Sequence, residues 1–149
     1  MIKPLVLATA TAALLLTGAA SVAAQSPAAD RAQVEKTLRA AGYTRIHEVE
    51  RDDGLWEADV TRDDGRFREV YVDPRTGEIF DEHDGRSQLT VEQVLAKARE
   101  QGLTGIHSLE RDGALWSLEA RNARNQRVEA RLSAHDGRIV DSERDGWLD

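Results

Sequence analysis

Apolar residues along the chain follow two different periods, which predict two kinds of element. From residue 91 to 98 they recur at helical spacing. Thr90, with Gln93 three positions later, forms the capping box that begins a helix, and Leu89 supplies a hydrophobic staple before it. The same offsets occur earlier in the chain, where Asp30 takes the capping position. The pattern therefore predicts two short helices, beginning after Asp30 and after Thr90.

Apolar and polar residues alternate in the segments that follow each helix. The period of two, typical of strands with one buried face, occurs in residues 56–60, 70–72, 116–120 and 128–132. Asp-Gly pairs, which favour tight hairpin turns, lie between the strands at 53–54, 64–65 and 112–113. A short further strand is expected around Ile79. Near Ile46 the apolar spacing is three rather than two, which is consistent with a bulge.

The two sets of elements are predicted to be copies of one unit. Gly-x-Thr-x-Ile-His occurs at 42–47 and 102–107, Glu-Arg-Asp at 50–52 and 110–112, and Leu-Trp at 55–56 and 115–116. The offset between the copies is the same for every pair (102 − 42 = 110 − 50 = 115 − 55), so we expect a tandem duplication. The predicted fold class is α+β, with two units that each pack one helix on a small antiparallel sheet of three to four strands. The first unit spans residues 25–86, and the second, divergent unit spans residues 87–149.

Residues 1–24 have the pattern of a secretory signal peptide. Lys3 precedes an apolar stretch from Leu5 to Leu16, and small residues follow up to Ala24. We expect cleavage before Gln25, which would release the remaining chain into the bacterial periplasm or the exterior, with no membrane attachment. An uncleaved membrane anchor is the alternative.

The charge and composition exclude several classes of function. The chain of 149 residues carries 20 Lys and Arg against 27 Asp and Glu, a formal net charge of −7, whereas nucleic-acid binding needs clustered basic residues. The absence of cysteine excludes thiolate nucleophiles, Cys-ligated zinc and iron–sulfur clusters. We therefore predict no nucleic-acid partner.

The sequence contains no motif for catalysis or metal binding. The four histidines have neither a histidine at i+4 nor a His-Glu-x-x-His context. The acidic pairs at 52–53 and 63–64 lack the ligand spacing of a calcium loop and are better explained as turns. No serine lies in a Gly-x-Ser-x-Gly motif. We predict no enzyme activity, no catalytic residue, no metal site and no cofactor.

Three aromatic residues are the candidate partner contacts. Phe67 and Tyr71 lie on the face of their strand opposite to its apolar residues, and the corresponding residues of the second unit are Arg127 and Arg131. The explanation that we favour is that the two aromatic residues pack between the units. The other is a surface patch that binds a partner. Trp147 stands near the C-terminus without a counterpart in the first unit and is the third candidate.

Three motifs of the first unit are shared with a known domain family. They are Gly-Tyr at 42–43, Gly-Leu-Trp-Glu at 54–57 and Val-Tyr-Val-Asp-Pro-Arg-Thr-Gly-Glu-Ile at 70–79. In these motifs the chain resembles the PepSY domain family. The resemblance covers residues 30–85 and extends more loosely over 90–146, where Ser-Ala-His-Asp-Gly replaces the Asp-Pro-Arg-Thr-Gly turn. The motifs consist of turn and core residues, which identify a fold better than a function.

The resemblance implies a role in regulating proteolysis. PepSY domains occur in the propeptides of thermolysin-type metallopeptidases and in bacterial envelope proteins, and no catalytic residue comes with the domain. We therefore expect an exported, non-enzymatic PepSY-domain protein, a binding or regulatory module that inhibits or regulates peptidases. Its expected partner is an unidentified protein, a peptidase or another envelope protein. The alternative is an envelope domain that senses a ligand or an ion.

Overall fold

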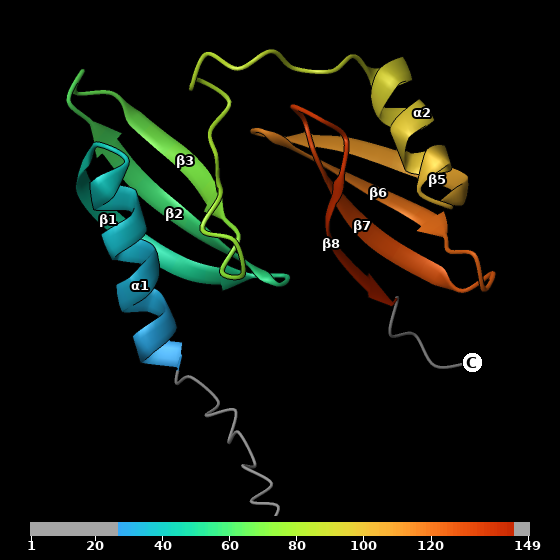
Figure 1. The fold of residues 1–149 in the computed structure, drawn as a ribbon, viewed down its shortest axis with the longest axis horizontal. Helices are drawn as coiled ribbons and strands as arrows, with labels where there is room; N and C mark the ends of the chain where they lie inside the picture. Colours follow the sequence, from blue (N-terminus) through green and yellow to red (C-terminus); the bar gives the residue numbers. More distant parts are fainter. Residues whose placement is uncertain (1–26, 145–149) are drawn as a thin grey trace, which may run out of the picture.

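The computed structural model describes residues 27–144, which form two short helices and eight strands (Figure 1). The first half of the molecule contains α1 (Pro27–Ala40), β1 (Tyr43–Asp52), β2 (Leu55–Arg62), β3 (Phe67–Val72) and β4 (Ile79–Phe80). The second half contains α2 (Val91–Glu100), β5 (Thr104–Asp112), β6 (Leu115–Arg121), β7 (Arg127–Ser133) and β8 (Ile139–Arg144). The predicted signal peptide at 1–24 lies outside the described residues. Neither helix within residues 27–144 is long and apolar enough to cross a membrane.

Strands dominate this fold, so the predicted α+β fold class is wrong. β1–β4 form one antiparallel four-stranded sheet and β5–β8 form another, each with its strands in sequence order. The strands contain more than twice as many residues as the two helices. The prediction treated each helix as a full structural layer of its unit, but the helices are only 14 and 10 residues long. Strands are the commonest element of the described chain because tight turns join them in succession.

The N-termini of the two helices differ in how well the sequence predicted them. At α2 the predicted capping box is confirmed: the Gln93 backbone N donates to Thr90 Oγ1 (3.3 Å), and the Thr90 backbone N donates to Gln93 Oε1 (2.8 Å). At α1 the prediction is wrong, because the helix begins at Pro27 rather than after Asp30. Proline is favoured in the first turn of a helix, and the Asp30 carboxylate in that turn stabilises the helix dipole.

The β1–β2 hairpin has the irregularity that its apolar spacing predicts. Its register shifts between Tyr43 and Arg45 and again between Ile46 and Glu48. The spacing near Ile46 left a bulge open, and the structure has one there. β1 is an edge strand of its sheet, where bulges are common because they twist the edge away from further pairing.

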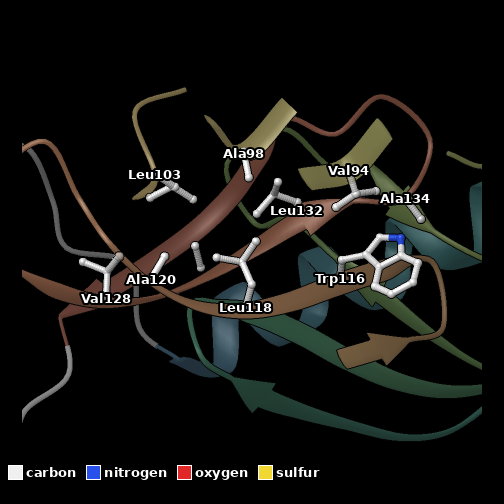
Figure 2. Close-up of a cluster of buried hydrophobic side chains, with 10 residues drawn as sticks. Val94, Ala98, Leu103, Trp116, Leu118, Ala120, Val128, Leu132 and Ala134 are labelled. Carbon is white, nitrogen blue, oxygen red and sulfur yellow. The ribbon is translucent and has the colours of Figure 1, made fainter. Parts of the chain in front are cut away.

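Each half has a core of its own. In the first half, Trp56, Ala58 and Val60 of β2 are almost completely buried, together with residues of α1, β1 and β3. The core of the second half is shown in Figure 2 and contains Val94, Ala98, Leu103, Trp116, Leu118, Ala120, Val128, Ala130, Leu132 and Ala134. The predicted burial of the alternating apolar residues is confirmed.

A third cluster joins the two halves, whose sheets lie side by side in Figure 1. It consists of six buried residues, three from each half: Leu55, Tyr71, Phe80, Ala114, Leu115 and Val140. At the border of this cluster Arg138 forms an ion pair with Glu78. The two residues are separated by the offset that the sequence analysis predicts between two copies of one unit. Contact between corresponding residues is the pattern of a self-complementary, two-fold interface. The two halves therefore meet in the manner of two subunits of a symmetric dimer.

Candidate binding groove

The structure separates the aromatic residues that the sequence singled out. Phe67, at the beginning of β3, is 61% exposed, and its ring centroid lies 5.8 Å from that of His47. Tyr71, near the end of the same strand, is 4% exposed. Phe67 and Tyr71 therefore do not come together in one surface patch. Trp147 lies outside the described residues.

Tyr71 lies between the two halves. Its hydroxyl donates to Asp112 Oδ2 (2.7 Å), and the guanidinium carbon of Arg131 lies 5.3 Å from its ring centroid. Burial raises the pKa of the Tyr71 hydroxyl, and the hydrogen bond to Asp112 raises it further. Arg131 Nη2 in turn lies 2.6 Å from Asp52 Oδ2, and Asp52 is the counterpart of Asp112 in the first half. Tyr71 is therefore part of a pair of reciprocal contacts between the halves.

Carboxylates crowd the face of the first sheet that is opposite to its core. Glu50 stands directly across from Glu57 on the next strand. Asp59 stands across from Glu69 in the same way. Burial raises the pKa values of Glu57 and Glu69, and neighbouring carboxylates raise them further. Among residues 27–144, no group of three or more Asp, Glu or His side chains is arranged to hold a metal ion.

A groove of about 420 Å³ opens between α1 and the turn that connects β3 to β4. It is lined by Asp30, Gln33, Val34 and Thr37 of α1 and by residues 72–77 of the strand end and turn. Val34 and Val72 supply its apolar part, since both belong to the buried core of the first half. The other lining side chains are mostly polar, so the groove combines an apolar base with hydrogen-bonding groups.

Hydrogen bonds hold the turn that forms one wall of the groove. Asp73 Oδ1 accepts from the backbone N and from Nε of Arg75 (2.8 and 3.1 Å). Burial raises the pKa of Asp73, but the hydrogen bonds from Arg75 outweigh this effect and hold the pKa below its usual value. The Arg75 guanidinium also donates to the backbone carbonyl of Val140, which attaches the turn to the second half. This wall is therefore in place before any partner binds.

The corresponding place in the second half is filled by the chain itself. A Cβ atom at Gly137 would lie 2.6 Å from Lys97 Cγ and 3.1 Å from Leu89 Cδ1. A Cβ atom at Gly77, the counterpart of Gly137 in the first half, would come no closer than 3.9 Å to Thr37 Cγ2. Among the residues that the structure describes, the groove is therefore open in the first half and closed in the second.

Our sequence predictions missed this groove, although a signal was present. Leu89 and Lys97, which close the second half, correspond in the first half to the smaller residues Ala29 and Thr37. The difference in size could have indicated free space near α1. Its location could not be inferred, because no local pattern shows that the segment before α2 crosses the β7–β8 turn.

Comparison with known proteins assigns a family to the first half. The PepSY family model described as a peptidase propeptide and YPEB domain matches residues 7–83, slightly more than half of the chain. Among solved structures, the chain is similar to the YpmB protein from Bacillus subtilis, at 16% identity and a TM-score of 0.37, over 76% of this chain and 94% of that chain. A search of curated proteins finds no match.

Proposed function

This chain belongs to the PepSY family of peptidase propeptide and YPEB domains, and on that premise we propose that it is a non-catalytic binding module that regulates peptidases. PepSY domains are in general propeptide or regulatory modules rather than enzymes. We further propose that residues 1–24 export the chain, so that it works in the periplasm or outside the cell. Its partner is then a peptidase or another envelope protein.

The open groove of the first half is the observation that supports this proposal. It joins an apolar base, formed by Val34 and Val72, to a polar rim, which is the combination found at binding sites for ligands and peptides. The Asp73–Arg75 interactions hold one wall in place. A wall that is already ordered loses little conformational entropy when a partner binds.

We propose that the two halves are the units 25–86 and 87–149 of a duplicated module with different roles. The reciprocal contacts of Tyr71 with Asp112 and of Arg131 with Asp52 support a common origin. The second half has closed its own groove, and through Val140 it holds the turn of the first. On this proposal the first half binds the partner and the second half supports it.

A capture and inhibition experiment tests the proposed function. The exported chain, residues 25–149, is immobilised and exposed to periplasmic extract, and bound proteins are identified by mass spectrometry. We expect a peptidase to be enriched and to lose its activity in proportion to added chain, up to one equivalent. The activity is followed with a fluorogenic peptide substrate.

Two variants locate the contact. Thr37→Lys introduces into α1 the residue whose counterpart, Lys97, closes the second half, so it should abolish capture and inhibition. Ala32→Lys adds the same charge to an exposed position of α1 that does not line the groove, and it should behave as the wild type. Enrichment of no peptidase, or equal inhibition by the Thr37→Lys variant, would contradict the proposal.

A further inference from the structure

We propose that the groove of the first half binds an extended polypeptide segment that presents a leucine side chain, in the way that the second half binds its own residues 87–89. The inference rests on the proposed function, because it takes the groove as the partner site and names the chemistry of what enters it. The second half serves as the template, since it contains both the site and its occupant.

The backbone of the occupant is recognised by the β7–β8 turn. The backbone N of Leu89 donates to the carbonyl oxygen of Ala134 (2.7 Å). Two positions earlier, the carbonyl oxygen of Ser87 lies 3.1 Å from Nδ1 of His135. Hydrogen bonds to alternate residues of a segment are the signature of an extended chain that pairs along one side. The segment before α2 therefore follows the turn as a short strand would.

The side chain of the occupant fills the apolar part of the site. Leu89 packs against the core cluster of the second half, which includes Val94 and Ala134. Ala134 is completely buried, and Gly137 is buried as well. The leucine side chain is thus partly buried against α2 and the turn.

The first half has the same site without the same occupant. Its counterparts of Ala134 and Gly137 are Pro74 and Gly77, and both are exposed. Val34 and Val72 are the counterparts of Val94 and Leu132, which belong to the core of the second half. The first half therefore retains the apolar base of the site. Pro74 is the sequence counterpart of the acceptor residue Ala134, whereas the counterpart of His135 is Arg75, whose guanidinium donates to Asp73 and to the carbonyl of Val140.

The path of the chain explains why the first half leaves its site open. α1 begins at Pro27, which corresponds to residue 87, whereas α2 begins at Val91. The residues that cross the turn as an extended segment in the second half are therefore helical in the first. In the second half the bond to the turn is donated by the backbone N of Leu89, whereas its counterpart, Ala29, lies in the first turn of α1 and not in an extended segment. An extended segment from another molecule would supply the strand and the leucine side chain that the described residues of the first half do not provide.

A peptide with the sequence of residues 84–90, Asp-Gly-Arg-Ser-Gln-Leu-Thr, is the probe for this site. The peptide, blocked at both ends, is titrated into the isotope-labelled exported chain, and amide chemical shifts are followed by NMR. We expect saturable shifts at residues 72–77 and 33–37. The peptide with alanine in place of leucine should bind about tenfold more weakly, because three buried carbon atoms are lost.

The variants and the outcomes decide between the two proposals. Thr37→Lys should remove the peptide-dependent shifts, and Ala32→Lys should keep them. Shifts that are absent at the groove, that are equal for the leucine and alanine peptides, or that persist in Thr37→Lys would overturn the inference. Peptide binding without capture of a peptidase would refute the proposed function and leave the inference standing. If the wild-type chain captures a peptidase that the Thr37→Lys variant does not, but the wild type does not bind the peptide, the proposed function would stand and the inference would be overturned.

Discussion

The β3–β4 turn of the first half and the β7–β8 turn of the second have nearly the same backbone but different surroundings. Gly77 and Gly137 have φ angles of 72° and 73°, and each donates its N–H over 2.8 Å to the carbonyl four residues earlier. In the second half the segment that carries Leu89 lies against this turn, whereas in the first half the turn borders an open groove. The comparison teaches that one backbone geometry is compatible with a filled and an unfilled site. The difference depends on the segment that precedes the helix.

The contact between the halves shows a second difference at corresponding positions. Tyr71 and Arg131 are counterparts in the two halves, and each reaches a carboxylate of the opposite half. Tyr71 donates one hydrogen bond to Asp112, whereas Arg131 forms an ion pair with Asp52. A geometry that is nearly symmetric therefore carries unequal interactions. Four predictions, each built on one principal substitution, test the two halves and the contact between them.

Arg131→Ala should have the largest effect on the contact between the two halves. The Arg131 side chain is only 10% exposed, and its loss leaves the partly buried Asp52 without its charge partner. We expect the free energy of unfolding to fall by about 3 kcal/mol. Tyr71→Phe removes only the hydroxyl that Asp112 accepts from and should cost about 1 kcal/mol. Denaturant titration followed by tryptophan fluorescence measures both values.

Arg127→Ala is the matched control for Arg131→Ala, because Arg127 lies on the same face of β7 and is exposed. It should change the free energy of unfolding by less than about 0.5 kcal/mol. An Arg131→Ala variant as stable as the Arg127→Ala variant would show that the contact between the halves contributes nothing measurable.

Gly137→Ala should destabilise the protein more than Gly77→Ala. Both substitutions place a side chain at a positive φ angle, which costs each variant about 1–2 kcal/mol. Only the Cβ atom at position 137 also overlaps Lys97 and Leu89, and overpacking of this kind costs about 1–3 kcal/mol more. The difference in melting temperature between the two variants measures the closure of the second half. Equal melting temperatures would mean that the second half is not closed in solution.

Asp73→Ser gives the first half the residue found at position 133 and should remove a pH-dependent stabilisation. A serine here can still accept from the backbone N of Arg75, as Ser133 accepts from that of His135, so only the guanidinium hydrogen bonds are lost. At pH 7 their loss should cost about 1–2 kcal/mol. The folded-state pKa of Asp73 is below its ordinary value, so its stabilising contribution is present above the unfolded pKa of about 3.9. The contribution is lost as the pH falls through the folded pKa. Urea titrations at pH 7 and pH 3 should show a smaller difference between the variant and the wild type at pH 3.

Glu69→Gln should have the smallest effect and the opposite sign. Glu69 stands across from Asp59, and removal of one of two facing charges should stabilise the sheet by about 0.5 kcal/mol. The folded-state pKa of Glu69 is raised, so its ionised form destabilises the folded protein above that pKa. The gain should therefore be present at pH 7 and disappear below the ordinary pKa of about 4.3. Thermal unfolding at both pH values measures it, and a gain that persists at pH 3.5 would rule out charge repulsion as the cause.

Features that depend on neighbouring residues were predicted from the sequence, and features that depend on distant segments were not. The capping box of Thr90 and Gln93 lies within four residues, and the bulge near Ile46 follows from the spacing of one strand. The beginning of α1 was predicted wrongly because it was placed by its sequence offset from the beginning of α2. Pro27, which is itself a local signal for the first turn of a helix, indicates the earlier start that the structure has. The fold class was wrong because the length of each element, and not only its type, decides which class a molecule belongs to.

The sequence by itself determined which side of each strand is apolar, where α2 begins and to which family the chain belongs. These features follow from residue periods and short motifs, which act through contacts within one element or one turn. Only the tertiary structure decided that Tyr71 is buried while Phe67, on the same face of the same strand, is exposed. The two residues lie on the same face of β3, because their positions differ by an even number. The second half of the molecule packs only against the end of β3 that carries Tyr71. The open groove beside Gly77 was decided in the same way, because the space between two segments depends on how both are placed.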